Sequence, residues 1–204
     1  TIKRFTELPD YYFTPDKLEA YKDGNLLKGG IVFADAITTV SSTYAEEIKL
    51  PFYGEGLDGL MRSRAGSLRG IVNGIDYDEF NPETDPYIAQ KYNARNFRKE
   101  KSKNKTALQE ELGLTRDPDK FMIGIVSRLT DQKGLDLIQC VMDEICSDDL
   151  QFVVLGTGDE RYENMFRHFD WKYNERVSAN IYYSNPMSHK IYAACDAYLM
   201  PSLF

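Results

Sequence analysis

The chain has 204 residues, of which 42% are hydrophobic and 28% charged, a composition typical of a globular protein of one to two domains. Its 25 basic and 32 acidic residues give a formal net charge of -7, so we do not expect nucleic acid as a partner. The sequence contains no apolar run near the ~20 residues that a bilayer-spanning helix needs, so we expect no membrane partner either.

The cysteines and histidines argue against two further kinds of site. Cys140, Cys146 and Cys195 are odd in number and lie in apolar stretches, which indicates reduced core thiols and a cytoplasmic location rather than a disulfide framework. The sequence has two histidines, His168 and His189, and no Cys-x-x-Cys pair, so we expect no metal site.

The first 75 residues combine an irregular start with short periodic segments. Residues 1–25 hold aromatic residues and two prolines without a clear period, and we expect a loop there. The pattern then predicts helices over 26–36 and 57–64, a helix capped by the serines at 41 and 42, and strands over 37–40 and 68–72.

A stretch without apolar periodicity follows. Residues 80–86 (FNPETDP) are punctuated by proline and predict a crossing segment between two packed bodies. Residues 91–105 carry seven basic residues and one acidic residue. They form either a patch for phosphate or another polyanion, or the solvated face of a helix that ends at Gly113, and we favour the helix face.

The remainder of the chain alternates regularly. Strands are predicted over 121–126, 150–155, 179–183 and 197–200, and helices over 135–146, 160–169 and 186–194. Nearly continuous apolar strands that alternate with helices predict an α/β fold with a parallel sheet covered on both faces. In such sheets ligands bind beyond the carboxyl ends of the strands, so functional residues are expected in the segments that follow them.

Two cations follow the first of these strands. Arg128 can donate two hydrogen bonds to a phosphate, and Lys133 adds a point charge at the start of the next helix. A diphosphate leaving group needs such charges because negative charge builds on it as its bond breaks. The alternative is a capped helix start with two incidental surface cations.

Glycines and tyrosines follow the next two strands. Gly156 and Gly158 allow a ligand to approach the backbone, and Asp159 can cap the following helix, but a plain turn fits equally. The GTGD segment at 156–159 does not match the G-x-G-x-x-G fingerprint of dinucleotide-binding proteins, and the chain contains no P-loop motif. Tyr183 and its neighbour Tyr182 can stack on a nucleobase, although core packing or surface exposure is the ordinary role of a tyrosine.

His189 has two interpretations as well. It can act as an acid or base near neutral pH, or it can form a hydrogen bond to a neighbouring loop. We favour the hydrogen bond.

Seven strings in colinear order resemble the bacterial glycogen synthases and plant starch synthases. They are TTVS at 38–41 followed by Tyr44 and Ala45, GLDGL at 56–60, IVNGID at 71–76, VSRLTDQKGLD at 126–136, LGTGD at 155–159, SHKIY at 188–192 and MPS at 200–202. Each string alone is modest evidence, and their order makes the resemblance strong.

The resemblance implies a GT-B type glycosyltransferase with two Rossmann-like domains. Such enzymes transfer glucose from ADP-glucose to the non-reducing end of an α-1,4-glucan with retention of configuration and need no metal or other cofactor. By motif, Arg128 and Lys133 hold the donor diphosphate, Tyr183 stacks on adenine, and Asn73 lies near the sugar. Gly156 and Gly158 line the donor pocket with backbone.

The resemblance also implies domain boundaries. Residues 1–75 correspond to the end of the N-terminal, acceptor-side domain, 76–118 to the interdomain crossing and its helix, and 119–204 to the first half of the donor domain. The family's glycine-rich loop would precede Thr1 and its acidic motif would follow Phe204. We therefore expect a central fragment, truncated at both ends and inactive in isolation.

Three alternatives stay open at this point. The chain can belong to a related glycosyltransferase with another donor or acceptor, or act as a non-catalytic nucleotide- or glucan-binding module. Nucleic-acid binding through residues 91–105 is the third, and it predicts an affinity that falls steeply with salt. The choice between ADP and UDP and the oligomeric state are not predicted.

Overall fold

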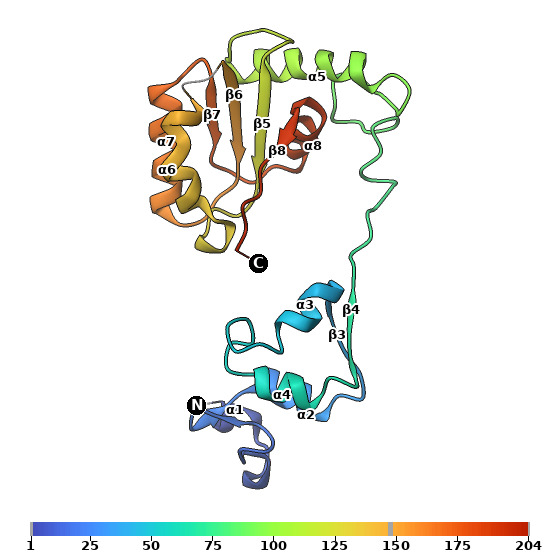
Figure 1. Cartoon of the computed structure of the whole chain (residues 1–204), viewed down its shortest axis with the longest axis vertical. Coiled ribbons are helices and arrows are strands. Elements are labelled where there is room, and N and C mark those ends of the chain that lie inside the picture. The colour runs from blue at the N-terminus through green and yellow to red at the C-terminus, as the bar shows by residue number, and fades with distance from the viewer. Residues whose placement is uncertain (1, 147–148, 204) are drawn as a thin grey trace. The chain divides into compact units, whose positions relative to one another are not determined.

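The computed structural model describes residues 2–146 and 149–203 and divides into two compact units, Thr1–Ile75 and Asp76–Phe204. Each unit is described separately (Figure 1). Within the described residues, no helix has both the length and the apolar character that crossing a bilayer requires.

The first unit is built around two parallel strands. Its elements are α1 (Lys3–Thr6), the 3-10 turn η1 (Asp10–Tyr12), β1 (Glu19–Ala20), β2 (Asp23–Gly24), α2 (Leu26–Phe33), β3 (Ile37–Val40), α3 (Ser42–Glu47), α4 (Asp58–Ser63) and β4 (Leu68–Ile71). Strands β3 and β4 pair in parallel with Ile37 opposite Leu68. Ala45, Ile48 and Leu68 form a small buried cluster between the strands and α3.

The expectation of a loop over residues 1–25 is wrong in part. The segment holds a short helix, a 3-10 turn and the β1–β2 hairpin. The two turn residues of the hairpin, Tyr21 and Lys22, have φ angles of 54° and 68°. Hairpin turns with this backbone are usually signalled by Asn or Gly, so the sequence pattern did not reveal it.

The second unit is a parallel α/β body. Its elements are α5 (Phe97–Leu112), β5 (Phe121–Val126), the 3-10 turn η2 (Asp131–Lys133), α6 (Leu135–Ile145), β6 (Leu150–Leu155), α7 (Glu160–Lys172), β7 (Val177–Asn180), α8 (Asn185–Ala194) and β8 (Ala197–Tyr198). The strand order is β7-β6-β5-β8 and every pair is parallel. The predicted α/β class with a parallel sheet is thus confirmed.

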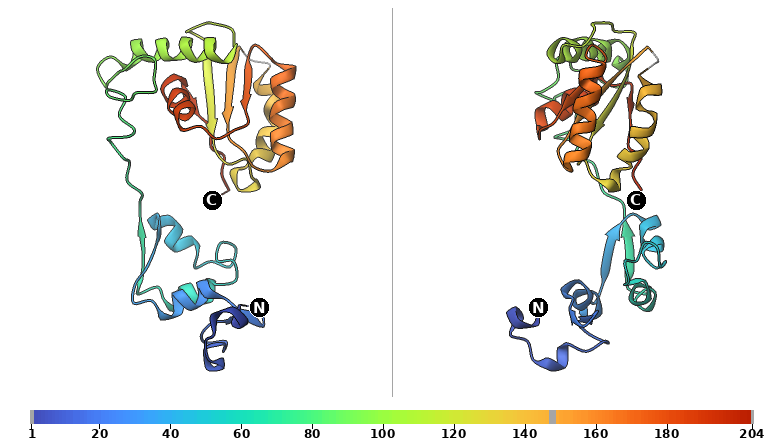
Figure 2. Two further views of the ribbon diagram at one scale, coloured as in Figure 1. Left: turned by 180° about the vertical axis from the view of Figure 1, so that it is seen from behind. Right: turned by 90° about the vertical axis from the view of Figure 1, so that its left-hand side faces the viewer.

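Helices cover both faces of this sheet. Helices α6 and α7 lie on one face, and α5 and α8 on the other (Figures 1 and 2). Because side chains alternate along a strand, Phe152 and Val154 of β6 enter the cluster under α6 and α7, while Val153 and Leu155 enter the cluster under α5 and α8. Burial on both faces explains the uninterrupted apolar run of β6.

The third strand of this unit begins and ends earlier than predicted. It spans Val177–Asn180 rather than 179–183, because the Tyr182 amide bonds to the Asn180 carbonyl and turns the chain out of the sheet. The fourth strand likewise ends at Tyr198. The other predicted elements are present, with ends shifted by up to three residues.

Residues 97–105 of the basic stretch form the first half of α5, and residues 91–96 precede the helix. The prediction of a solvated helix face is wrong in part. Lys105 is 5% exposed, and its Nζ lies 2.6 Å from the Asp196 carboxylate. Lys101 donates to the Tyr192 carbonyl at 3.0 Å, and burial lowers the pKa of its amine. Two of the seven cations therefore bind α5 to the body of the unit.

Candidate functional site

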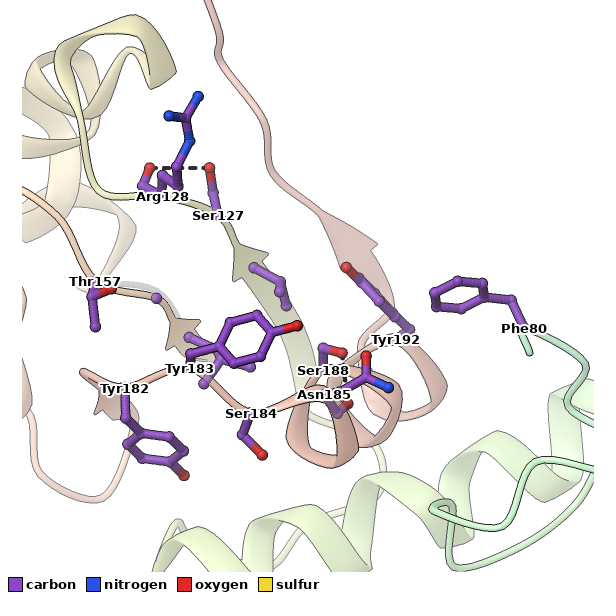
Figure 3. A pocket seen from close by; sticks show the side chains of 13 residues that line it. Phe80, Ser127, Arg128, Thr157, Tyr182, Tyr183, Ser184, Asn185, Ser188 and Tyr192 are labelled. Carbon is purple, nitrogen blue, oxygen red and sulfur yellow. Dashed lines mark hydrogen bonds between the residues drawn. The ribbon is translucent and has the colours of Figure 1, made fainter. Parts of the chain in front are cut away.

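A cavity of about 310 Å³ opens at the carboxyl ends of β5, β6 and β7 (Figure 3). Residues 126–128, 155–157 and 182–185 line it where the three strands end, and Ser188 and Tyr192 of α8 and Phe80 complete the lining. Strands β6 and β7 lie on one side of β5, and the later strand β8 lies on the other. The side on which successive strands are added therefore changes at β5, beside this cavity. Ligands of open α/β sheets bind at such switch points.

Arg128 brings positive charge to the cavity. It follows β5, is exposed, and forms no ion pair with a carboxylate of the described residues. Its guanidinium extends away from the tyrosine rings of the cavity (Figure 3). The five N–H donors of this side chain are therefore free to bind an anionic group.

Lys133 does not line the cavity. It is half-buried in η2, and Gly134 follows it in a left-handed conformation with φ 63°. A side chain at Gly134 would collide with the carbonyl of Pro201, so the turn packs against the last described segment. Of the two predicted cations, the structure brings Arg128 and not Lys133 to the cavity wall.

Gly156 and Gly158 hold two loops together. A Cβ at Gly156 would collide with the Ser127 carbonyl oxygen, and a Cβ at Gly158 with that of Leu129. Gly156 lines the cavity, whereas Gly158 forms an isolated parallel bridge with Leu129 outside it. The glycines are needed first for the close approach of protein backbone to protein backbone, a role the sequence analysis had not assigned.

The predicted cap at Asp159 is wrong. Asp159 occupies the N-cap position of α7, but its side chain accepts no capping hydrogen bond. Glu163, one turn into the helix, accepts from the Gly158 amide at 3.0 Å, and this bond lowers the pKa of the Glu163 carboxyl.

Aromatic faces border the rest of the cavity. Tyr183 is 89% exposed and lies across the middle of the view in Figure 3. Tyr182 is partly fixed, since its hydroxyl donates to Asn180 Oδ1 at 3.2 Å. Tyr183 thus presents a free ring, which is what stacking on a planar ligand requires.

Helix α8 contributes residues to which no role was assigned from the sequence, although Ser188 and Tyr192 lie within the SHKIY string. Asn185, Ser188 and Tyr192 line the cavity and recur at helical spacing, which places them on one face. Ser184 caps the helix by accepting from the Met187 amide at 3.2 Å. The spacing of three and four residues was the signal available in the sequence.

Asn73 lies in the other unit. It is exposed and follows β4. Its predicted place near a sugar stays a prediction.

The titratable groups of the described residues offer no metal site and no reactive thiol at the cavity. No cluster of three His, Cys, Asp or Glu among residues 2–146 and 149–203 has the geometry to hold a metal ion. The three cysteines are free thiols, but Cys140 is exposed and not a core residue as predicted. Burial raises the pKa of Tyr192 to about 12, with a further contribution from Tyr198.

The first unit and the whole chain each match known proteins. Residues 1–63 match the family described as starch synthase catalytic domain. The chain is 75% identical over 203 residues to a glycogen synthase from Lachnospira eligens, covering 100% of this chain and 42% of the relative. It is 69% identical over 204 residues to a glycogen synthase from Lachnoclostridium phytofermentans, covering 100% of this chain and 43% of the relative.

A solved structure matches the fold as well. The catalytic domain of starch synthase IV from Arabidopsis thaliana, bound to ADP and acarbose, superposes with a TM-score of 0.89 at 33% identity. The match covers 97% of this chain and 42% of that one. The chain thus spans less than half the length of the relatives it matches, and the resemblance predicted from its motifs is confirmed.

Proposed function

We propose that this chain, a segment with the sequence and fold of the glycogen and starch synthase family, carries the donor-nucleotide site of a glucosyltransferase. The reaction is transfer of glucose from ADP-glucose to the non-reducing end of an α-1,4-glucan with retention of configuration. The observation that carries the proposal is one cavity that combines the unpaired Arg128 with the exposed ring of Tyr183 at a sheet switch point.

Each group has a role in that reaction. Arg128 binds the diphosphate and stabilises the negative charge that develops on ADP as the glycosidic bond breaks. Tyr183 stacks on the adenine. Lys133 adds long-range positive charge, Asn73 contacts the glucosyl group, and Gly156 and Gly158 shape the loops that face the donor.

The ligands named for the solved relative support the substrate classes. Its nucleotide is ADP, and acarbose is an oligosaccharide analogue, so a nucleotide and a glucan are the ligands we assign here. The free cysteines support a reducing compartment such as the cytoplasm. Catalysis by this arrangement needs no metal in our proposal, because the charge on the leaving group is met by Arg128 and Lys133.

Titration calorimetry with ADP, UDP and adenosine tests the donor site. Arg128→Ala should weaken ADP binding about 10- to 100-fold, because hydrogen bonds to a charged group are worth about 1.5–3 kcal/mol, and should leave adenosine binding nearly unchanged. Lys133→Ala should weaken ADP binding less. Arg98→Ala, which removes an equal charge from α5 outside the cavity, is the control.

A graft tests the reaction. This chain would replace the matching segment of the Lachnospira eligens relative, and transfer of glucose to glycogen would be measured with ADP-glucose and UDP-glucose. Transfer from ADP-glucose that is lost with Arg128→Ala supports the proposal. Transfer from UDP-glucose alone would favour a related glycosyltransferase with another donor, and ADP binding without transfer would favour a binding module.

A further inference from the structure

One wall of the cavity comes from the segment that precedes α5. Phe80 lies in the proline-punctuated stretch 80–86 and is 43% exposed at the cavity edge. Figure 3 shows its ring beside Tyr192, with the two ring centroids 6.4 Å apart in an edge-to-face arrangement. No motif assigns this phenylalanine a role.

An imidazole supports the ring of Phe80 from behind. The Phe80 and His189 rings stack with centroids 4.8 Å apart and an interplanar angle of 8°. Tyr87 contacts the same imidazole edge-on at 5.2 Å. His189 therefore contacts two aromatic residues of one segment, and its ring plane is the surface on which Phe80 stacks.

A buried carboxylate sets that orientation. Asp85 Oδ2 lies 2.7 Å from His189 Nδ1, and the residues are 6% and 2% exposed. The other carboxylate oxygen of Asp85 accepts from the Tyr87 amide at 2.9 Å. A separation of 2.7 Å is a hydrogen bond, and it restricts the plane of the imidazole.

The second imidazole nitrogen has no hydrogen-bond partner among the described residues. His189 Nε2 is buried, and the Glu79 carboxylate lies 3.9 Å away, where it accepts from Asn185 Nδ2 at 3.3 Å. Burying a histidine and an aspartate with one nitrogen unsatisfied costs stability that an apolar pair would not. A pair kept at such a cost is better explained by the geometry it imposes than by the stability it gives.

We propose that Asp85 and His189 are positioning residues that hold Phe80 as a preformed wall of the donor-nucleotide cavity. The inference rests on the proposed function and adds residues that touch neither the diphosphate nor the reacting sugar. Phe80 is ordered before the nucleotide arrives, so binding does not have to immobilise its side chain and the turn that carries it.

The test measures ADP dissociation constants by calorimetry on the 204-residue chain. Phe80→Ala and Asp85→Ala should each weaken the binding of ADP and of adenosine by about three- to tenfold. The factor should be the same for the two ligands, because the wall contacts the nucleoside and not the phosphates. In the Phe80→Ala background, Asp85→Ala should cause no further loss, since it acts through Phe80. Additive losses would overturn the inference.

A control on the same helix separates positioning from general stability. Lys190→Ala removes the ion pair to Glu111 at 2.6 Å, which joins α8 to α5 next to His189 but outside this cavity. It should leave ADP affinity unchanged even if the melting temperature falls. A loss of affinity equal to that of Asp85→Ala would overturn the inference.

A spectroscopic variant keeps the test decisive if Asp85→Ala fails to fold. The chain has one tryptophan, Trp171, so Trp171→Phe with Phe80→Trp places a single indole at the wall. ADP should change its emission, and an unchanged spectrum on binding would overturn the inference. If the wild-type chain binds neither ADP nor UDP, both proposals fail; if it binds ADP and the Phe80 variants bind equally well, this one fails alone.

Discussion

At the scale of single residues, Gly156 combines a structural and a site role. A Cβ at Gly156 would overlap the Ser127 carbonyl oxygen, so any side chain would force the two loops apart. Gly156→Ala should lower the free energy of unfolding by about 1–3 kcal/mol, as overpacking does. Thr157→Ala, an exposed change on the adjacent residue, should alter it by no more than about 0.5 kcal/mol. Urea denaturation measures the free energy of unfolding of both variants. Equal losses would contradict a collision between a side chain at position 156 and the Ser127 carbonyl.

The three thiols should differ sharply in reactivity. Cys140 is exposed, whereas burial raises the pKa of Cys146 and raises that of Cys195 to about 12. Because the thiolate is the reactive form, we expect one thiol per chain to react quickly with a disulfide reagent at pH 8. Cys140→Ser should abolish the fast phase, and a remaining fast thiol would disprove the assignment.

The same burial predicts how stability depends on alkaline pH. Cys195 and Tyr192 have folded-state pKa values of about 12, against ordinary values of 9.0 and 10.0. A raised pKa contributes stability that is complete below the unfolded value and is lost as pH rises toward the folded one. The melting temperature should therefore fall between pH 9 and pH 12. The double variant Cys195→Ala, Tyr192→Phe should show a flatter decline, and an identical slope would count against these groups.

At the scale of elements, a buried amide pair binds α5 to β6. Gln109 and Gln151 are both fully buried, and the Gln109 amide donates to Gln151 Oε1 at 2.7 Å. Gln151 in turn donates to the Thr115 carbonyl at 2.7 Å, in the connection that leads from α5 toward β5. The network is satisfied at both ends, so it fixes how the helix and the strand pack together.

Breaking this pair should be costly. Gln151→Leu leaves one N–H of the Gln109 amide without an acceptor, while the other keeps the Asp117 carbonyl, and it removes the donor to the Thr115 carbonyl. We expect the free energy of unfolding to fall by about 1–3 kcal/mol for the buried N–H that is left unsatisfied. Gln139→Leu, the same change on an exposed position of α6, should stay within about 0.5 kcal/mol. Urea denaturation of both variants measures the two free energies of unfolding. Similar losses would refute the view that the amide pair stabilises the packing of α5 on β6.

At the scale of the whole molecule, the cavity belongs to one unit. All residues that line it lie in Asp76–Phe204, and residues 71–79 are exposed. We predict that limited proteolysis first cuts within 71–79 and that the 76–204 fragment binds ADP with the affinity of the whole chain. Calorimetry on the purified fragment is the measurement. A loss of more than about tenfold would show that the first unit contributes to nucleotide binding.

The sequence by itself determined the parts of this protein that depend on local pattern. The strands at 121–126 and 150–155 were predictable because burial on both faces demands unbroken apolar runs. Arg128, Gly156 and Tyr183 were predictable because each follows a strand whose carboxyl end meets the others at one edge of the sheet. Spacing along the chain predicts these positions, whereas the binding roles of the three residues come from the family resemblance and stay predictions.

Only the tertiary structure decided the contacts between distant segments. Asp85 and His189 are 104 positions apart, and Phe80, which lines the cavity, stacks on the imidazole of that pair. Lys133, predicted to hold a diphosphate, does not line the cavity, and the turn that follows it packs at Gly134 against Pro201. Periodicity reports which face of an element is buried. Which segment covers that face depends on the packing of the whole body, so the wall of this cavity could be seen only once the chain was folded.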